Sequence, residues 1–193
     1  MIEEVLRFDA DGLALEGRLA YADWLETPDH AVLICPPHPF LGGDMENNVL
    51  QALSAALAAR GVPVLRFNYR GIGGSETARD LADDQREFWQ HSSCPRYEAE
   101  IAHDCEHAFA TLHRLLPGVA ASVIGYSFGC LPALTIAATA PLAKLCLISP
   151  PLVKWPIAPA ALDLDCPRAL FYAPGDFACP TADIEALHAA LCG

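Results

Sequence analysis

Residues 121–130 read Ala-Ser-Val-Ile-Gly-Tyr-Ser-Phe-Gly-Cys, and this stretch decides the fold. Its first six residues are typical of a buried strand, and a helix is expected over 128–140. Gly125 and Gly129 flank Ser127 in G-x-S-x-G spacing, which suits a sharp strand-to-helix turn that exposes the serine hydroxyl at the carboxyl edge of a sheet. We therefore predict Ser127 to be a nucleophile. The alternative is a Gly-Ser turn without chemistry, because so short a motif also arises by chance.

On both sides of this turn, apolar runs alternate with helical segments. The expected strands are residues 2–8, 13–21, 31–35, 62–67, 121–126, 144–149 and 168–173, and the further expected helices are 46–60, 96–116 and 181–191. Asp11-Gly12 is a tight-turn signal between the first two strands. The alternation predicts an α/β fold with a mainly parallel sheet, in one domain over residues 1–193. We interpret the polar, acidic segment 75–95 as a surface insertion, or alternatively as a lid.

Amino-acid composition disfavours several classes of binding partner and several kinds of site. The 193 residues carry a formal net charge of -12, which disfavours nucleic acids and anionic membrane surfaces. No apolar run reaches the length of about 18 residues that a transmembrane helix needs, and the acidic start, unlike a basic signal peptide, predicts a cytoplasmic protein. The eight cysteines are scattered without a Cys-x-x-Cys pair, so we expect neither disulfides nor a metal site among them. No cofactor is expected.

Two further loops follow predicted strands. Residues 36–43, P-P-H-P-F-L-G-G, come after the 31–35 strand and can bend toward the nucleophile to offer a backbone N–H. For the His38 side chain, we favour a hydrogen bond to the backbone over an accessory role in the reaction. Residues 67–76, F-N-Y-R-G-I-G-G-S-E, lack both the G-x-G-x-x-G spacing and a following P-loop lysine, so we do not expect them to bind phosphate.

Together, these three segments resemble the small bacterial α/β-hydrolases that carry an H-P-x-x-G-G loop, an R-G-x-G-x-S loop and a G-x-S-x-G turn, in that order. The resemblance covers about residues 30–190 and implies a three-layer α/β-hydrolase fold. It also implies an oxyanion hole made by the backbone N–H groups of Phe40 and Phe128. It further implies an acid in the loop after the 168–173 strand, and a histidine after one more strand.

The sequence departs from this family pattern near its end. Asp176 is the only carboxylate in the loop A-P-G-D-F-A-C-P at 173–180, and it is either the acid of the triad or the cap of a turn. His188 is the only histidine after Ser127. It lies in the final predicted helix, which should cover a face of the sheet, so we do not assign it as the base. The sequence thus predicts a C-terminally shortened fold without an identifiable triad histidine.

A rival motif lies at residues 103–107, where H-D-C-E-H matches the H-x-x-E-H pattern of some zinc proteases. Two histidines four residues apart share one face of a helix. No third ligand is evident from the sequence, so we interpret the motif as a solvated polar face without a metal.

Two hypotheses of function remain. The first is a serine hydrolase of small carboxylic esters or thioesters, acting through an acyl-Ser127 intermediate. The second is a catalytically deficient or truncated α/β-hydrolase-fold protein with a binding or scaffold role. Apolar residues expected around the site favour a small uncharged or acyl substrate; these are Phe40, Tyr126, Phe128 and Trp155. The 168–173 strand should lie at an open sheet edge, which favours either a homodimer near that edge or poor behaviour in solution.

Overall fold

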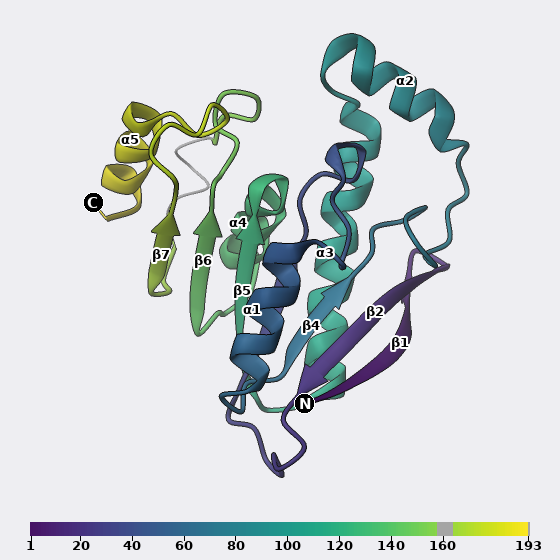
Figure 1. Ribbon diagram of the computed structural model, residues 1–193, viewed down its shortest axis with the longest axis vertical. Coiled ribbons are helices and arrows are strands. Elements are labelled where there is room, and N and C mark those ends of the chain that lie inside the picture. The colour runs from purple at the N-terminus through teal and green to yellow at the C-terminus, as the bar shows by residue number, and fades with distance from the viewer. Residues whose placement is uncertain (158–163, 193) are drawn as a thin grey trace.

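One sheet of seven strands, in the order β1-β2-β4-β3-β5-β6-β7, organises the computed structural model, which describes residues 1–157 and 164–192 (Figure 1). The strands are β1 (Ile2–Ala10), β2 (Leu13–Tyr21), β3 (His30–Cys35), β4 (Val64–Phe67), β5 (Ala120–Tyr126), β6 (Lys144–Ile148) and β7 (Arg168–Phe171). β2 is antiparallel to β1 and β4, and β4, β3, β5, β6 and β7 are parallel. The mainly parallel sheet predicted from the sequence is therefore confirmed.

Five α-helices accompany the sheet in the part of the chain that the structure describes. They are α1 (Asn48–Ala58), α2 (Leu81–His91), α3 (Pro95–Leu115), α4 (Cys130–Thr139) and α5 (Thr181–Cys192). α1 packs Leu50 against Val32, Ile34 and Val64 on one face of the sheet. α3 and α4 cover the other face, and buried residues of α5 belong to the same apolar cluster. This three-layer arrangement buries both faces of β3, as the apolar run at 31–35 predicts.

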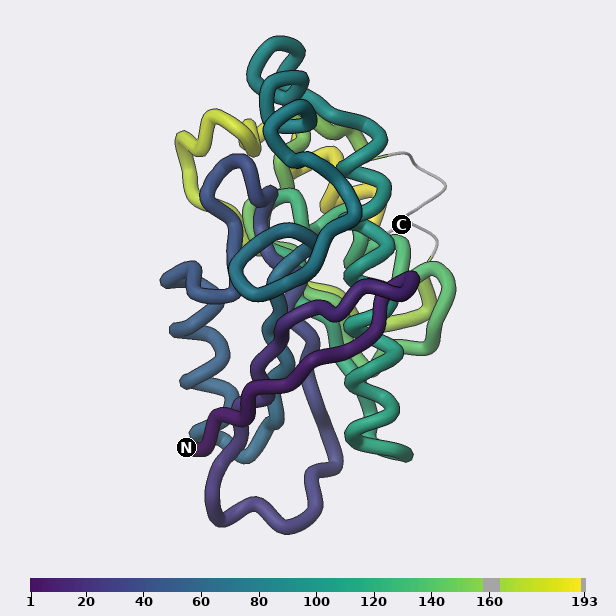
Figure 2. Tube along the Cα trace, turned by 90° about the vertical axis from the view of Figure 1, so that its right-hand side faces the viewer, coloured from purple at the N-terminus to yellow at the C-terminus, as the bar shows by residue number. Residues whose placement is uncertain are grey.

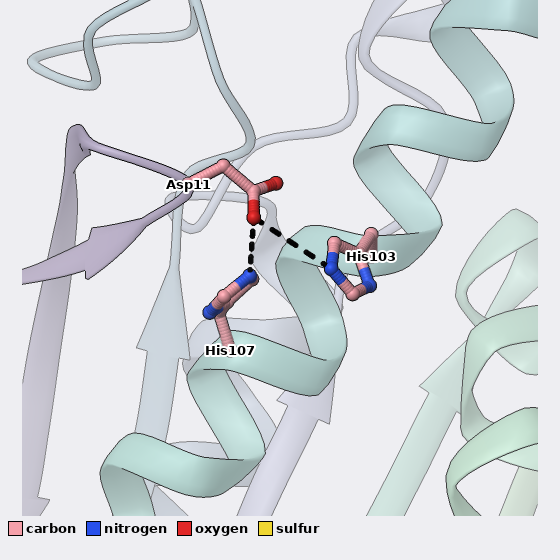
Figure 3. Close-up of side chains that lie close together, drawn as sticks. All are labelled: Asp11, His103 and His107. Carbon is pink, nitrogen blue, oxygen red and sulfur yellow. Dashed lines mark hydrogen bonds and ion pairs between the residues drawn. The ribbon is translucent and has the colours of Figure 1, made fainter.

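The first hairpin follows the turn chemistry of the sequence. Asp11 and Gly12 both have left-handed backbones, with φ of 57° and 83°. Two consecutive positive φ angles are the requirement of the type I′ turn, whose twist matches that of the flanking strands. The turn places the Asp11 side chain beside α3 (Figure 3).

The insertion at 75–95 contains helix α2, which rises beyond the carboxyl ends of the strands (Figures 1 and 2). The Asp80 side chain caps it by accepting a hydrogen bond from the Ala82 N–H at 2.9 Å. Phe88 is the one large apolar residue of α2 that is fully buried, whereas Trp89 stays 61 % exposed. The segment is thus attached to the body of the protein through Phe88.

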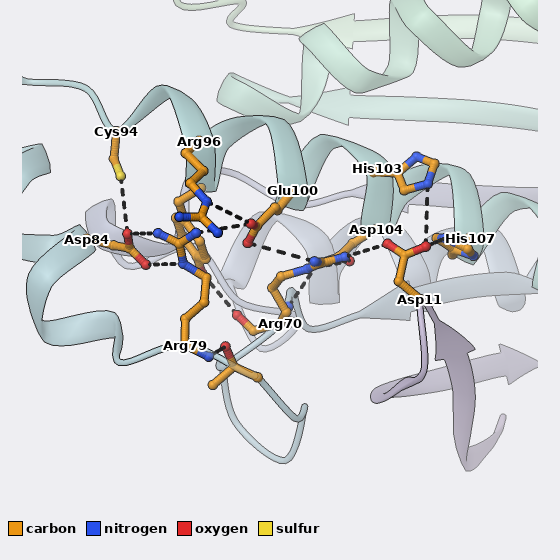
Figure 4. Close-up of polar contacts among 12 residues, drawn as sticks. Asp11, Arg70, Arg79, Asp84, Cys94, Arg96, Glu100, His103, Asp104 and His107 are labelled. Atoms are coloured by element: carbon orange, nitrogen blue, oxygen red, sulfur yellow. Dashed lines mark hydrogen bonds and ion pairs between the residues drawn. The ribbon is translucent and has the colours of Figure 1, made fainter.

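Buried ion pairs fix the loop at 67–76 to α3 (Figure 4). Arg70 donates from Nη2 to Asp104 Oδ1 at 2.6 Å, and its backbone N–H donates to Asp104 Oδ2 at 3.0 Å. The Tyr97 hydroxyl donates to the Arg70 carbonyl at 3.0 Å. Arg70 is therefore occupied in holding the loop on α3. Among the residues that the structure describes, no helix is both long and apolar enough to cross a membrane.

Candidate active site

Ser127 lies at the abrupt turn between β5 and α4. The chain passes from Tyr126, in extended conformation, into a short 3-10 turn at Ser127–Gly129 that continues as α4. Ser127 has a φ of 53°, in the left-handed region that residues with a side chain rarely adopt. The strand–turn–helix context predicted for the G-x-S-x-G motif is present.

Two glycines allow this turn to pack closely. A Cβ atom at Gly129 would lie 2.2 Å from the Cys35 carbonyl oxygen at the end of β3, and one at Gly125 would lie 2.6 Å from the Cys130 Cα. No side chain fits at such distances. The glycine spacing thus serves a steric need, which is to press the start of α4 against β3 and β5.

The register of the parallel strands gathers the other loops at the same edge. Cys35 pairs with Gly125, and Tyr126 pairs with Ile148, so the loop at 36–43 and the segment after β6 both begin beside the turn. Ile148 in turn pairs with Phe171, which adds the loop after β7. The loops that the sequence singled out therefore lie around the edge that carries Ser127.

His38 is enclosed in an aromatic cage at this edge. Its side chain is 0 % exposed and stacks on Phe88 of α2 at 4.4 Å and on Trp155 at 5.7 Å, measured between ring centroids. Edge-on contacts with Phe128 at 5.1 Å and Tyr97 at 6.4 Å complete the cage. Phe128 and Trp155, two of the apolar residues expected around the site, thus lie together in this cage, and His38 contacts the Ser127 turn through the Phe128 ring.

Hydrogen bonding and charge hold His38 neutral. Its Nδ1 accepts a hydrogen bond from the Phe40 backbone N–H at 3.2 Å, so Nδ1 is the unprotonated nitrogen. Burial, together with the nearby Lys154 ammonium, lowers the pKa of His38 to about 3. His38 Nε2 has no hydrogen-bond partner among the described residues, and the closest carboxylate oxygen, Glu98 Oε1, is 3.8 Å away.

The sequence did not single out Phe88, Glu98 and Lys154, which also border the cage. The Lys154 Nζ lies 3.8 Å above the Phe88 ring, and Glu98 Oε2 accepts a hydrogen bond from Trp155 Nε1 at 3.2 Å. They come from α2, α3 and the segment after β6, which no local motif joins. An aromatic pair in a polar insertion, Phe88-Trp89, was the only sequence signal for this contact.

The structure gives the contacts of three residues that the sequence placed at or near the site. The Phe40 N–H, expected to face an oxyanion, already donates to His38. Asp176 Oδ1 accepts a hydrogen bond from the Ala178 N–H at 2.9 Å, so the turn-capping interpretation is the one that its contacts match. Tyr126 packs on the α1 side of the sheet, away from the cage, because side chains alternate along β5.

The surroundings of the Ser127 hydroxyl can be compared with the triad that the family pattern implies. In the described part of the chain, no hydrogen bond joins the Ser127 hydroxyl to another side chain. His188 lies exposed on α5, where it lines a surface hollow with Leu170 and Tyr172 of the β7 region. As the sequence predicts, α5 packs its apolar side inward, through Ile184, Leu187 and Leu191.

Comparison with known proteins agrees with this architecture. Residues 32–174 match the family described as the alpha/beta hydrolase fold. A putative alpha/beta hydrolase of Agrobacterium tumefaciens superposes with a TM-score of 0.79 at 24 % identity, covering 98 % of this chain and 79 % of that one. An alpha-beta serine hydrolase homologue of Coxiella burnetii gives 0.79 at 22 % identity, over 97 % and 81 % of the two chains. At these identities, the likeness concerns the fold.

Two further matches differ in how much of this chain they cover. An alpha/beta serine hydrolase without lid from Xanthomonas campestris superposes with a TM-score of 0.74 at 21 % identity, over 95 % of this chain and 77 % of that one. An uncharacterised protein of Rickettsia prowazekii is 40 % identical over 62 residues, which are 32 % of this chain. The match spans only 25 % of that relative.

Proposed function

Because the chain belongs to the alpha/beta hydrolase fold family, we propose that it is a serine hydrolase of small carboxylic esters or thioesters that forms an acyl-enzyme at Ser127. The observation that carries this proposal is the left-handed backbone of Ser127, with φ of 53°, between a strand and a helix. Such a conformation costs about 1–3 kcal/mol at a residue with a side chain, and it persists only where the surrounding structure enforces it. Here the close packing of Gly125 and Gly129 enforces it.

In the proposed reaction, the Ser127 Oγ attacks the ester carbonyl carbon while a base takes the hydroxyl proton. The bond to the alcohol or thiol then breaks, this leaving group takes up the proton, and the acyl group stays on Ser127. During the attack, negative charge develops on the carbonyl oxygen, where the N-terminus of α4 and the Phe128 N–H favour it. The Phe40 N–H can contribute only if it exchanges its bond to His38 Nδ1 for one to the substrate. That exchange would free His38 Nδ1 to accept a proton, which is the accessory role that we propose for His38.

The aromatic cage supports the proposed substrate class. Phe40, Phe88, Phe128 and Trp155 border the edge on which Ser127 lies. Among the described residues, Lys154 is the one cation placed over their rings. Such walls favour an uncharged acyl group. We accordingly propose a short apolar acyl chain, with the alcohol or thiol side undefined.

A second candidate rests on a different observation. A serine hydrolase needs a proton acceptor for the Ser127 hydroxyl, and loss of a triad member leaves only about 10³- to 10⁴-fold catalysis over water. Within residues 1–157 and 164–192, Nδ1 of His38 is committed to Phe40, and Asp176 caps its own turn. A catalytically deficient hydrolase fold with a binding or scaffold role is the function that these contacts favour.

Hydrolysis of p-nitrophenyl acetate separates the two candidates. We would compare the unmodified protein with Ser127→Ala and with Ser149→Ala, a matched control at the end of β6 that also has a left-handed backbone, with φ of 46°. The hydrolase proposal expects activity that Ser127→Ala abolishes and Ser149→Ala retains. Equal, near-background rates in all three proteins would overturn it and leave the second candidate.

If Ser127 is active, His38→Asn and His188→Asn identify the base. Loss of activity in one variant alone would assign that histidine. Asp176→Ala belongs in the same series, because a triad acid affects turnover, whereas a turn cap affects stability by about 1 kcal/mol.

A further inference from the structure

The β1–β2 turn and helix α3 meet at three side chains that can each offer a metal ligand: Asp11, His103 and His107 (Figure 3). None of them belongs to the turn at Ser127 or to the cage around His38. The sequence supplied the two histidines, four residues apart on α3, but no third ligand. The structure supplies Asp11, which is 92 residues earlier in the chain and reaches the histidines from the type I′ turn.

The three ligand atoms have the spacing of one coordination sphere. Asp11 Oδ1 lies 3.1 Å from His107 Nε2 and 3.8 Å from His103 Nε2, and all three atoms lie within 4.8 Å of one another. Bonds of about 2.0–2.1 Å to a tetrahedral Zn²⁺ place ligand atoms about 3.4 Å apart. Small side-chain rotations therefore suffice to close the sphere, and there is space for them, because all three side chains are partly exposed.

A carboxylate behind the first histidine orients it. His103 Nδ1 lies 2.9 Å from Glu106 Oε2, which directs the other nitrogen, Nε2, toward Asp11. A ligand histidine in a metal protein typically donates its second N–H to a carboxylate in this way. Glu106 is thereby engaged with His103, which argues against the role of general base that the H-x-x-E-H pattern has in proteases.

The charges around the cluster also suit a divalent cation. Arg70 contacts Asp11 Oδ2 at 3.3 Å through Nη2, but the same guanidinium is bound to Asp104 at 2.6 Å and lies 3.8 Å from Glu100 (Figure 4). Arg70 therefore faces three carboxylates, of which Glu100 is also paired with Arg79 at 3.1 Å and with Arg96 at 3.6 Å. Arg70 fixes Asp11 through Oδ2 and leaves Oδ1 directed at the histidines.

We propose that Asp11, His103 and His107 form a binding site for a divalent transition metal of the Zn²⁺ class, with solvent at the remaining position. Two imidazole nitrogens favour Zn²⁺ or a similar ion over Mg²⁺ and Ca²⁺, which prefer oxygen ligands. The bound ion would join the β1–β2 turn to α3. Its effect is on the stability of the hairpin, and its test does not depend on the chemistry of Ser127.

Calorimetric titration of the chelator-treated protein with ZnCl₂ at pH 7.5 tests the site. We expect one equivalent to bind and the melting temperature to rise with Zn²⁺ concentration. His107→Ala and Asp11→Asn should each weaken binding by more than about 100-fold, and Glu106→Gln, which disturbs only the orienting carboxylate, by about 10- to 100-fold. His113→Ala, on the same helix but outside the cluster, should bind as the unmodified protein does.

Two controls keep the outcome decisive. Circular dichroism and melting in excess chelator show whether each variant folds, and Asp11→Asn preserves side-chain shape where His107→Ala does not. Cys94→Ser removes a competing group, Asp84, Glu87 and Cys94, whose ligand atoms also lie within 4.8 Å of one another. Undetectable binding by the unmodified protein, binding by the Asp11 and His107 variants as tight as that of the unmodified protein, or loss of binding in Cys94→Ser would each overturn the proposal. Co²⁺ absorption without a thiolate charge-transfer band would support it.

Discussion

His38 and Phe40 are joined by a hydrogen bond in which the Phe40 backbone N–H donates to His38 Nδ1 at 3.2 Å, inside a fully buried cage. This bond couples the loop after β3 to the protonation state of His38, because a protonated Nδ1 cannot accept it. The pKa of His38 in the folded protein is lowered to about 3 by burial and by Lys154. An ordinary histidine, as in the unfolded chain, has a pKa of about 6.5.

The first prediction concerns stability against pH. Between pH 6.5 and 3 the unfolded chain binds a proton at residue 38 that the folded protein does not bind. The free energy of unfolding should therefore fall as the pH decreases through this window, by about 2 kcal/mol between pH 6.5 and pH 5. His38→Asn retains an acceptor for the Phe40 N–H but does not titrate. Urea unfolding of both proteins at these two pH values should show a smaller loss in the variant, and equal losses would contradict the assignment.

The second prediction tests the turn at Ser127. Gly129→Ala would place a methyl group 2.2 Å from the Cys35 carbonyl oxygen, which neither backbone can avoid without moving. We expect a loss of about 3 kcal/mol or more in the free energy of unfolding, together with loss of any Ser127-dependent hydrolysis.

Gly118→Ala is the matched control for that variant. Gly118 has a φ of 79°, but a Cβ atom there would meet nothing within 4 Å. Its substitution should cost only the left-handed strain, about 1 kcal/mol. Urea midpoints that show Gly129→Ala to be no worse than Gly118→Ala would mean that the turn relaxes freely.

Local chemistry explains why so much of the fold could be predicted. Asp11-Gly12 meets the demand of a type I′ turn, and residues 31–35 are apolar throughout because both faces of β3 are covered. The ends of some helices differ from those predicted, because a side chain caps the helix at a residue that the apolar pattern does not indicate. The helix expected from residue 46 begins at Asn48, since Asn47 caps it by accepting a hydrogen bond from the Val49 N–H at 3.0 Å.

The candidate site was less accessible to sequence reasoning, because it depends on contacts between distant segments. Ser127 could be found, since its turn is a local motif. Phe88 and Trp155, which both stack on His38, come from two segments that read only as polar or proline-rich. Asp11 likewise joins His107 across 96 residues, and no spacing rule indicates such a pair.

The third prediction concerns the attachment of α2. Asp84 is buried and accepts two hydrogen bonds from the Arg79 guanidinium, which lowers the pKa of Asp84. The ionised carboxylate therefore stabilises the fold above the ordinary aspartate pKa of about 4, and this contribution is lost as the pH falls through the lowered value. Asp84→Asn should cost about 2 kcal/mol at pH 7 and little near pH 2.

Asp83→Asn provides the comparison, because Asp83 is exposed and pairs only with the exposed Arg86. It should change the free energy of unfolding by less than about 0.5 kcal/mol at either pH. Equal effects of the two variants at pH 7 would contradict a role of Asp84 in holding α2. If α2 is also a lid, Asp84→Asn should change KM for bulky esters more than for p-nitrophenyl acetate.

The last prediction concerns association through the β7 edge. β7 pairs with β6, no second partner strand occurs among the described residues, and Phe171 and Phe177 are 57 % and 91 % exposed. An open apolar edge favours pairing with a second copy, so we expect a dimer that Phe171→Lys dissociates. Val5→Lys, on the opposite edge strand β1, where Val5 is 69 % exposed, should leave the dimer intact. Light scattering distinguishes these outcomes, and a monodisperse monomer of the unmodified protein would count against association at this edge.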